Sequence, residues 1–158
     1  MPEGQEKKVE YLELIYDLIF VYLIGRKNSI LHYVEDGVVT GEVFLAYVLC
    51  SLAVIQIWNF STFYINLYGR NSVRDHIFLF TNMYLLYHMA DGIRTAWQGS
   101  FYQFCIAWAL ILVNIGVQHL IEMKRRRAEP WVLEMLKRKS LIILGEAVLI
   151  LIHMLVYS

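Results

Sequence analysis

The sequence carries little charge and no excess of either sign. Asp, Glu, Lys and Arg make up 18% of its 158 residues, and 14 basic residues balance 14 acidic ones. A chain without net charge has no overall field that attracts nucleic acid, so we expect no nucleic-acid partner. Hydrophobic residues make up 58% of the chain and aromatic residues 15%. A soluble domain could not cover so much apolar surface with polar groups, so the composition predicts an integral membrane protein partnered by the lipid bilayer.

Cysteine is scarce, and the common catalytic motifs are absent. Cys50 and Cys105 lie in apolar runs and form no CxxC or other closely spaced ligand pair, which predicts buried thiols rather than a metal site. The sequence contains no GxSxG, HExxH or P-loop motif. A bis-histidine haem would require two histidines at one depth on facing helices, and His88 and His153 meet that condition only loosely. We therefore expect no enzymatic activity and no cofactor.

Five apolar runs approach the length that crosses a bilayer, about 20 helical residues. Runs such as 141–144 do not alternate apolar and polar residues as membrane β-strands do, and backbone groups in lipid must find their partners within a helix. We therefore predict an all-α, polytopic transmembrane bundle that forms one domain over residues 1–158. Its helices are expected at roughly 9–31, 43–68, 76–93, 102–121 and 140–157.

The connections between these runs differ in basic residues, and the difference predicts a topology. Of the 14 Lys and Arg residues, 11 fall on the side of the N-terminus, and Arg26, Lys27 and Arg94 fall on the other. By the positive-inside rule we expect the N-terminus in the cytoplasm and the C-terminus outside. The longest cytoplasmic connection, 122–139, holds two basic runs around Pro130. We interpret it as a basic interfacial segment that either anchors the topology or binds anionic lipid.

Each predicted helix carries a strongly polar residue at a similar depth. Counted at about 1.5 Å per residue from the cytoplasmic end of its helix, each lies roughly 9–14 Å inside that surface. These residues are Asp17, Asn59, Asn82, Asn114 and Glu146. Polar groups are costly in hydrocarbon, so we expect the five to converge in the bundle interior, where amides donate hydrogen bonds to carboxylates.

Two interpretations of this polar layer stay open. It is either glue that fixes helix packing through modest interhelical hydrogen bonds, or a binding site for a cation or a proton. Glu13 shares a helix face with Asp17 at i, i+4, and burial beside a like charge favours the protonated acid. Arg74, in the short cytoplasmic turn, is the candidate electrostatic partner, and an ion pair with it would favour the charged acid instead. Whether a metal ion binds is left open.

Three stretches together resemble the bacterial low temperature requirement A family. Residues 10–22, which read Glu-Tyr-Leu-Glu-Leu-Ile-Tyr-Asp-Leu-Ile-Phe-Val-Tyr, are similar to the opening of that family. Its second and third helices are matched by Trp58-Asn59, Asn66, Arg74, Met83 and Met89-Ala90, and its LGE motif by Ile142-Ile143-Leu144-Gly145-Glu146. The resemblance covers nearly the whole chain and selects Glu13, Asp17, Asn59, Arg74, Gly145 and Glu146. It implies a polytopic bacterial membrane protein and brings no firm substrate.

Members of that family usually continue through several more helices after the LGE motif, whereas this sequence stops at Ser158. We expect a fragment, a short homologue or one half of a larger assembly. If it is a half, the bias in basic residues favours a parallel homo-oligomer.

The leading functional hypothesis is a transporter or channel-like protein of the bacterial cytoplasmic membrane that moves a proton, a cation or a small solute. Asp17 and Glu146 would bind the proton or cation, with Glu13 beside them and the three asparagines as neutral ligands. The competing hypothesis is a structural or sensory membrane protein whose polar layer only locks the packing.

Overall fold

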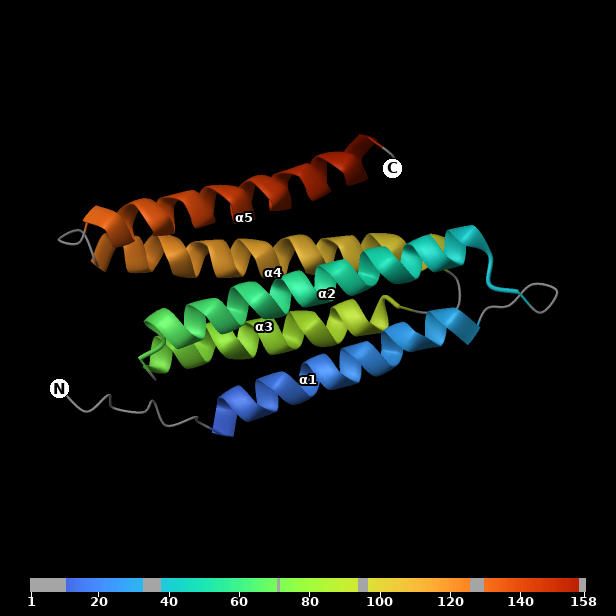
Figure 1. Cartoon of the computed structure of the whole chain (residues 1–158), viewed down its shortest axis with the longest axis horizontal. Helices are drawn as coiled ribbons and strands as arrows, with labels where there is room; N and C mark the ends of the chain where they lie inside the picture. The colour runs from blue at the N-terminus through green and yellow to red at the C-terminus, as the bar shows by residue number, and fades with distance from the viewer. Residues whose placement is uncertain (1–10, 33–37, 71, 94–96, 126–129, 157–158) are drawn as a thin grey trace.

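Five α-helices run back and forth along one bundle in the computed structural model of the chain (Figure 1). The structure describes residues 11–32, 38–70, 72–93, 97–125 and 130–156, with the backbone alone for 97–100. The helices are α1 (Tyr11–Asn28), α2 (Gly41–Tyr68), α3 (Val73–Asp91), α4 (Trp97–Arg125) and α5 (Pro130–Val156), and a short 3-10 helix, η1 (Ser29–His32), follows α1. The predicted all-α fold with about five helices is confirmed.

The basic segment predicted at 122–139 is not an element of its own. Helix α4 continues to Arg125, because a run of charged residues without glycine or proline does not end a helix. Helix α5 then begins at Pro130 and runs without a break to Val156. Proline suits this first position because its missing N–H would have no partner there and its φ is already helical. Residues 130–139 are therefore the first part of α5, whereas 126–129 lie outside the described residues.

Three of the helices are long and apolar enough to cross a membrane. They are α2, the part of α4 from Phe101 onward, and α5. Their apolar side chains also face outward: Leu52, Ile55, Leu141 and Leu149 are all more than half exposed. Outward-facing leucine and isoleucine along a whole helix fit a lipid environment better than water.

Helices α1 and α3 are shorter and carry more charge. At 18 and 19 residues they span about 27–29 Å at 1.5 Å per residue, close to the ~30 Å of a bilayer core. They lie alongside the other helices (Figure 1). That both cross the bilayer stays a prediction.

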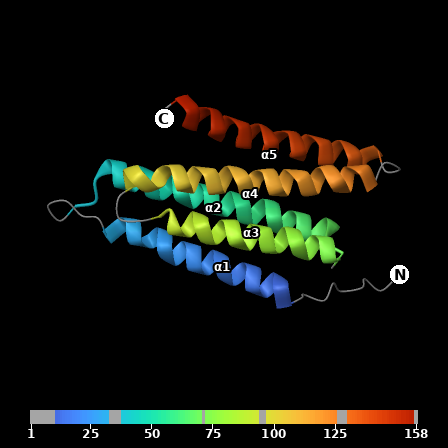
Figure 2. The ribbon, with the colours of Figure 1, turned by 180° about the vertical axis from the view of Figure 1, so that it is seen from behind.

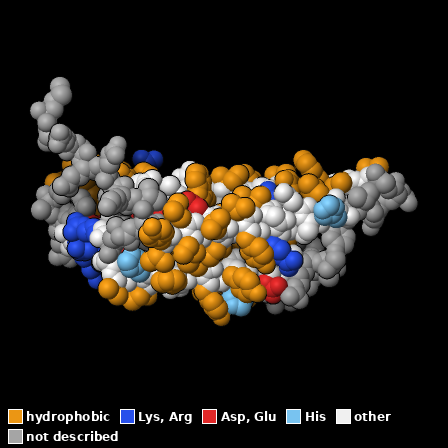
Figure 3. All heavy atoms as spheres, turned by 90° about the horizontal axis from the view of Figure 1, so that it is seen from below, with side chains coloured by type: hydrophobic (Ala, Val, Ile, Leu, Met, Phe, Trp, Pro, Cys, Tyr) orange, Lys and Arg blue, Asp and Glu red, His pale blue; other side chains and the backbone are white. Residues whose placement is uncertain are grey.

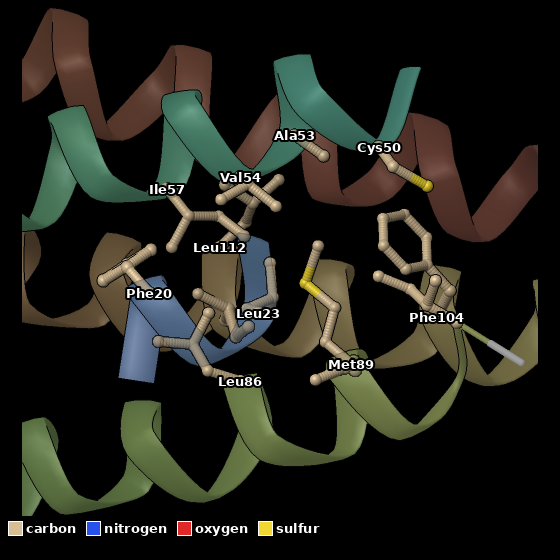
Figure 4. Close-up of a cluster of buried hydrophobic side chains, with 14 of the residues drawn as sticks. Phe20, Leu23, Cys50, Ala53, Val54, Ile57, Leu86, Met89, Phe104 and Leu112 are labelled. Atoms are coloured by element: carbon tan, nitrogen blue, oxygen red, sulfur yellow. The ribbon is translucent and has the colours of Figure 1, made fainter. Parts of the chain in front are cut away.

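An apolar core fills the space between α1, α2, α3 and α4. Leu23, Ile57, Leu86 and Leu112 come from one helix each and are fully buried (Figure 4). In α1 the buried side chains recur every three or four residues, at Tyr16, Phe20, Leu23 and Lys27, so one stripe of this helix faces the core.

Helix α4 is central and α5 is peripheral. Of the apolar stretch of each helix, 56% is buried in α4 and 17% in α5. Helix α5 packs along α4 and, within the described part of the chain, makes no close backbone contact with another helix (Figures 1 and 2). The packing is close where Leu144 lies over Gly116: a Cβ at Gly116 would fall 2.5 Å from a methyl carbon of Leu144.

Basic side chains gather where α2 turns into α3 and where α4 ends, and we call this the basic end of the bundle. Its described members in this region are Arg70, Arg74, Lys124 and Arg125. On the face shown in Figure 3, apolar side chains cover the middle, and Lys and Arg gather at the left end and again to the right of the middle. At the opposite end, Arg26 and Asp91 form an ion pair at 4.0 Å. Arg94, predicted on that side as well, lies outside the described residues.

Candidate functional site

The five polar residues predicted to form one layer are divided among separate groups. Asp17 is exposed, and its carboxylate accepts a hydrogen bond from the Trp58 indole at 3.4 Å. Glu146 accepts one from the Gln56 amide at 2.6 Å. Trp58 and Gln56 are two positions apart on α2, and residues at this spacing point to different sides of a helix. The prediction that both acids meet in the bundle interior is therefore wrong.

Two of the predicted residues do meet inside the bundle. The Asn114 amide donates to the Asn82 side-chain oxygen at 2.8 Å and to the Phe78 carbonyl at 3.1 Å. Nearby, the Tyr16 hydroxyl donates to Ser61 at 2.7 Å, and Asn82 is a neighbour of Tyr16. Tyr16, Ser61, Asn82 and Asn114 come from α1, α2, α3 and α4 in turn, and we call them the polar network. The network joins all four helices of the core.

A small cavity lined by both polar and apolar side chains lies beside this network, toward the basic end. Its volume is about 40 Å³. A buried water needs roughly 10–15 Å³ of such space and two or more polar partners, so about three waters fit. The polar residues that line the cavity are Glu13, Ser61, Tyr64, Asp75, His76, Asn82 and Gln118. The cavity thus reaches from the network to the first turns of α1 and α3.

Asp75 is held in place by the start of α3. Its carboxylate accepts hydrogen bonds from the backbone N–H groups of Arg70 at 3.1 Å and Ser72 at 3.4 Å, and the Ser72 hydroxyl accepts one from the Asp75 N–H. Ser72 and Asp75 form a reciprocal capping box. Burial alone would raise the pKa of Asp75, but these hydrogen bonds and the Arg74 guanidinium at 3.3 Å outweigh burial and lower it.

Replacing Asp75 with asparagine should cost about 1 kcal/mol of folding free energy at neutral pH, the usual value of a helix cap. Because the pKa of Asp75 is lowered in the folded protein, its stabilisation is present above the ordinary carboxyl pKa and is lost as pH falls through the folded value. Thermal unfolding of both proteins should therefore differ at pH 7 and converge below about pH 4. A gap that stays constant with pH would mean that the charge of Asp75 contributes nothing.

Glu122, which the sequence analysis placed in a connection, is completely buried at the end of α4. Its carboxylate lies 3.8 Å from Arg70, 3.9 Å from Arg74 and 3.8 Å from Arg125. Among the described residues, Arg74 therefore pairs with Glu122 and Asp75 rather than with Asp17, the acid that the sequence suggested as its partner. Three cations from the α2–α3 turn, α3 and α4 converge on one acid, so we call this group the Glu122 cluster.

His119, one turn before Glu122 on α4, is also fully buried. Its Nδ1 lies 2.9 Å from the Ile115 carbonyl, and its ring packs against Tyr64 at 5.2 Å between centroids. In that geometry Nδ1 carries the proton, and Nε2 has no hydrogen-bond partner among the described residues. The periodicity of α4 explains the burial, because Ile111, Ile115, His119 and Glu122 recur every three or four residues on one face.

Asn59 lies away from the polar network. It is exposed on α2, in a groove between α2 and α5 that has a volume of about 610 Å³. Gln56 and Glu146 line the same groove, so two of the predicted residues, Asn59 and Glu146, share it without Asp17.

Metal ligands do not cluster in the described part of the chain. No group of three or more His, Cys, Asp or Glu side chains is placed there to hold a metal ion. Cys50 and Cys105 are both buried and free, as predicted from the apolar runs around them.

The fold defines a class: a polytopic helical membrane protein whose charged groups gather at the helix ends and whose core holds an amide-rich network. Residues 8–158 match the family model described as bacterial low temperature requirement A protein, and the chain belongs to that family. Searches of curated proteins and of solved structures find no match.

Proposed function

We propose that this membrane protein is a transporter or channel-like protein for a proton or a small cation, and that the ion binds in the cavity at the basic end. The observation that carries the proposal is the cavity itself, because several polar side chains line it, it is large enough for about three waters, and it is adjacent to the network that joins four helices. A volume of about 40 Å³ excludes larger solutes in this conformation.

The groups around the cavity suit a hard cation or a hydrated proton. Glu13 and Asp75 supply carboxylate oxygens, and Ser61, Asn82 and Gln118 supply neutral oxygens. Oxygen donors of this kind bind small cations, and a chain of water and hydroxyl groups carries protons. Asp75 accepts two backbone N–H groups and pairs with Arg74, so its carboxylate has a structural role at the start of α3. We assign the ion to Glu13, the other acid that lines the cavity.

This proposal keeps part of the set chosen from the sequence. Glu13, Asn82 and Asn114 stay in the site or in the network beside it. Asp17, Asn59 and Glu146 do not line the cavity, so they have no role in this proposed site.

The competing proposal is that the polar network only fixes helix packing. Its support is that the Asn114 amide already finds two partners, Asn82 and Phe78, without any ion. Each such interhelical hydrogen bond stabilises a bundle by about 0.6–2 kcal/mol. The two proposals differ in function, because glue can stay dry whereas an ion site needs water to reach Glu13.

Flux through reconstituted protein separates them. We expect liposomes with the wild type to pass protons or a monovalent cation, and Glu13→Gln to lower that flux by at least about five-fold, since a charge near 4 Å contributes roughly 1–4 kcal/mol. Glu134→Gln, the same change at an exposed position on α5, should leave it unaltered. Flux equal to that of empty liposomes, or equal in Glu13→Gln and wild type, would contradict the proposal.

Several expectations from the sequence join this proposal. We place the protein in the bacterial cytoplasmic membrane with its N-terminus inside, on the 11-to-3 division of basic residues. We propose that the basic residues in 122–139 contact anionic lipid and that the protein assembles as a parallel homo-oligomer. We also propose that it has no enzymatic activity.

A further inference from the structure

A long groove runs along the outside of the bundle between α2 and α5. Both helices pack on α4 but make no close backbone contact with each other in the described residues, so the face of α4 between them stays open. The widest part has a volume of about 610 Å³ and is lined by Leu52, Gln56, Phe60, Trp108 and Glu146 among others. Sites for small organic molecules measure about 300–1,000 Å³, so the groove has the size of such a site.

Glu146 is the one charged residue among those described as lining this part of the groove. Its side chain is half-buried, and the Gln56 amide donates a hydrogen bond to Oε2 at 2.6 Å. Because α2 and α5 are both long and apolar enough to span a bilayer, a groove between them would face hydrocarbon in a spanning arrangement. A carboxylate there is costly unless a proton or a positive charge accompanies it. One neutral amide does not supply that charge.

The groove continues into a second hollow along the same helices. This hollow has a volume of about 250 Å³ and shares Leu49 and Trp108 with the first. Phe101, Phe104 and His153 also line it. Aromatic faces attract cations, and the remaining apolar lining suits hydrocarbon or aromatic groups. Together, the two hollows place the carboxylate of Glu146 in the first hollow and a mainly apolar and aromatic lining around the remaining surface.

We propose that this groove is a binding site for lipophilic cations, meaning amines, ammonium or phosphonium ions that carry a hydrocarbon or aromatic body. The cation enters sideways from the bilayer, pairs with Glu146 and lays its apolar body along α2, α4 and α5. The groove shares none of its described lining residues with the cavity at the basic end, so this site does not depend on the proposed ion site.

Binding of two probes with the same shape and opposite charge tests the proposal. Tetraphenylphosphonium is added to the purified protein in lipid nanodiscs, and tetraphenylborate serves as the matched anion. We expect saturable binding of the cation and no saturable binding of the anion. Glu146→Gln, which can keep a hydrogen bond to Gln56, should weaken cation binding by at least about ten-fold.

Two further variants make the test specific. Asp17→Asn removes an exposed acid outside the groove and should leave the affinity for the cation unchanged. Leu52→Trp fills the groove while Glu146 stays in place, and it should also weaken binding. Equal affinity in Glu146→Gln and wild type, or equal binding of both probes, would overturn the proposal. A loss of binding in Glu13→Gln as well would also overturn it, since that residue lines only the other cavity.

Discussion

Replacing Glu122 with glutamine is expected to lower the free energy of unfolding by about 3 kcal/mol, which corresponds roughly to a 6–12 °C lower melting temperature for a chain of this size. The carboxylate is fully buried and lies within 4.0 Å of three guanidinium groups. Glutamine has almost the same shape but no charge. The three arginines would then repel one another around a buried neutral amide, and the tie between the α2–α3 turn and α4 would be lost.

Thermal unfolding in detergent, followed by tryptophan fluorescence, measures this effect. Glu134→Gln makes the same chemical change at an exposed position and should move stability by less than about 0.5 kcal/mol. Adding Arg74→Gln to Glu122→Gln should cost less than the sum of the two single changes, because the two side chains contact each other. A Glu122→Gln protein that melts like the wild type would show that the Glu122 cluster does not hold this end of the bundle together.

Gly92→Ala is expected to destabilise the protein by about 2 kcal/mol, within the range for overpacked sites. An added Cβ would lie 3.0 Å from the backbone nitrogen of Phe104 and 3.3 Å from the Met89 carbonyl oxygen. Backbone atoms cannot rotate away as a side chain can, so α4 itself would have to move from α3. The close approach of the Gly92 and Phe104 backbones therefore fixes the distance between the end of α3 and the facing part of α4.

Gly145→Ala is the matched control. A Cβ at Gly145 would meet nothing within 4 Å, and alanine favours a helix interior over glycine by about 1 kcal/mol. We therefore expect Gly145→Ala to melt at or above the wild-type temperature, although the family resemblance selected this glycine. If the alanine variants at 92 and 145 behaved alike, the contact between α3 and α4 would not be the cause.

The fold was largely predictable because its main signal is the length of apolar runs. Runs near 20 residues fix the number of helices in lipid, and the structure has five. Helix ends were harder to predict. The fourth apolar run ends at 121, where charges begin, but helix α4 continues to Arg125. Charge marks where a helix leaves lipid, and it does not mark where the hydrogen-bonded backbone ends.

The site was only partly predictable, because depth along a helix says nothing about direction around it. Asp17 is one position from the buried Tyr16, and that single step turns its side chain out of the core. Asn82, by contrast, shares the buried stripe of Leu79 and Leu86. In a soluble helix the polar face would have revealed this difference. In lipid both faces are apolar, so the sequence gives little sign of which face is inside.

Glu122 and His119 were missed for a related reason. Both lie at the end of the apolar run 102–121, where the sequence itself does not distinguish a buried polar side chain from a solvated one. The spacing along α4 is the signal that could have identified them, because His119 lies four residues after the buried Ile115 and Glu122 lies three residues after His119. Two of the three partners of Glu122, Arg70 and Arg74, come from other segments, and a local pattern does not identify such contacts.

Whether water reaches the cavity at the basic end decides between an ion site and packing glue. Hydroxyl-radical footprinting of the protein in nanodiscs measures this directly, because radicals form from water next to the side chain. Tyr64 lines the cavity and is only 3% exposed, whereas Met89 is fully buried in the apolar core. We predict rapid oxidation of Tyr64 and His76 and protection of Met89, although methionine is a readily oxidised residue. Protection of Tyr64 as complete as that of Met89 would mean a dry cavity and would contradict the proposed ion site.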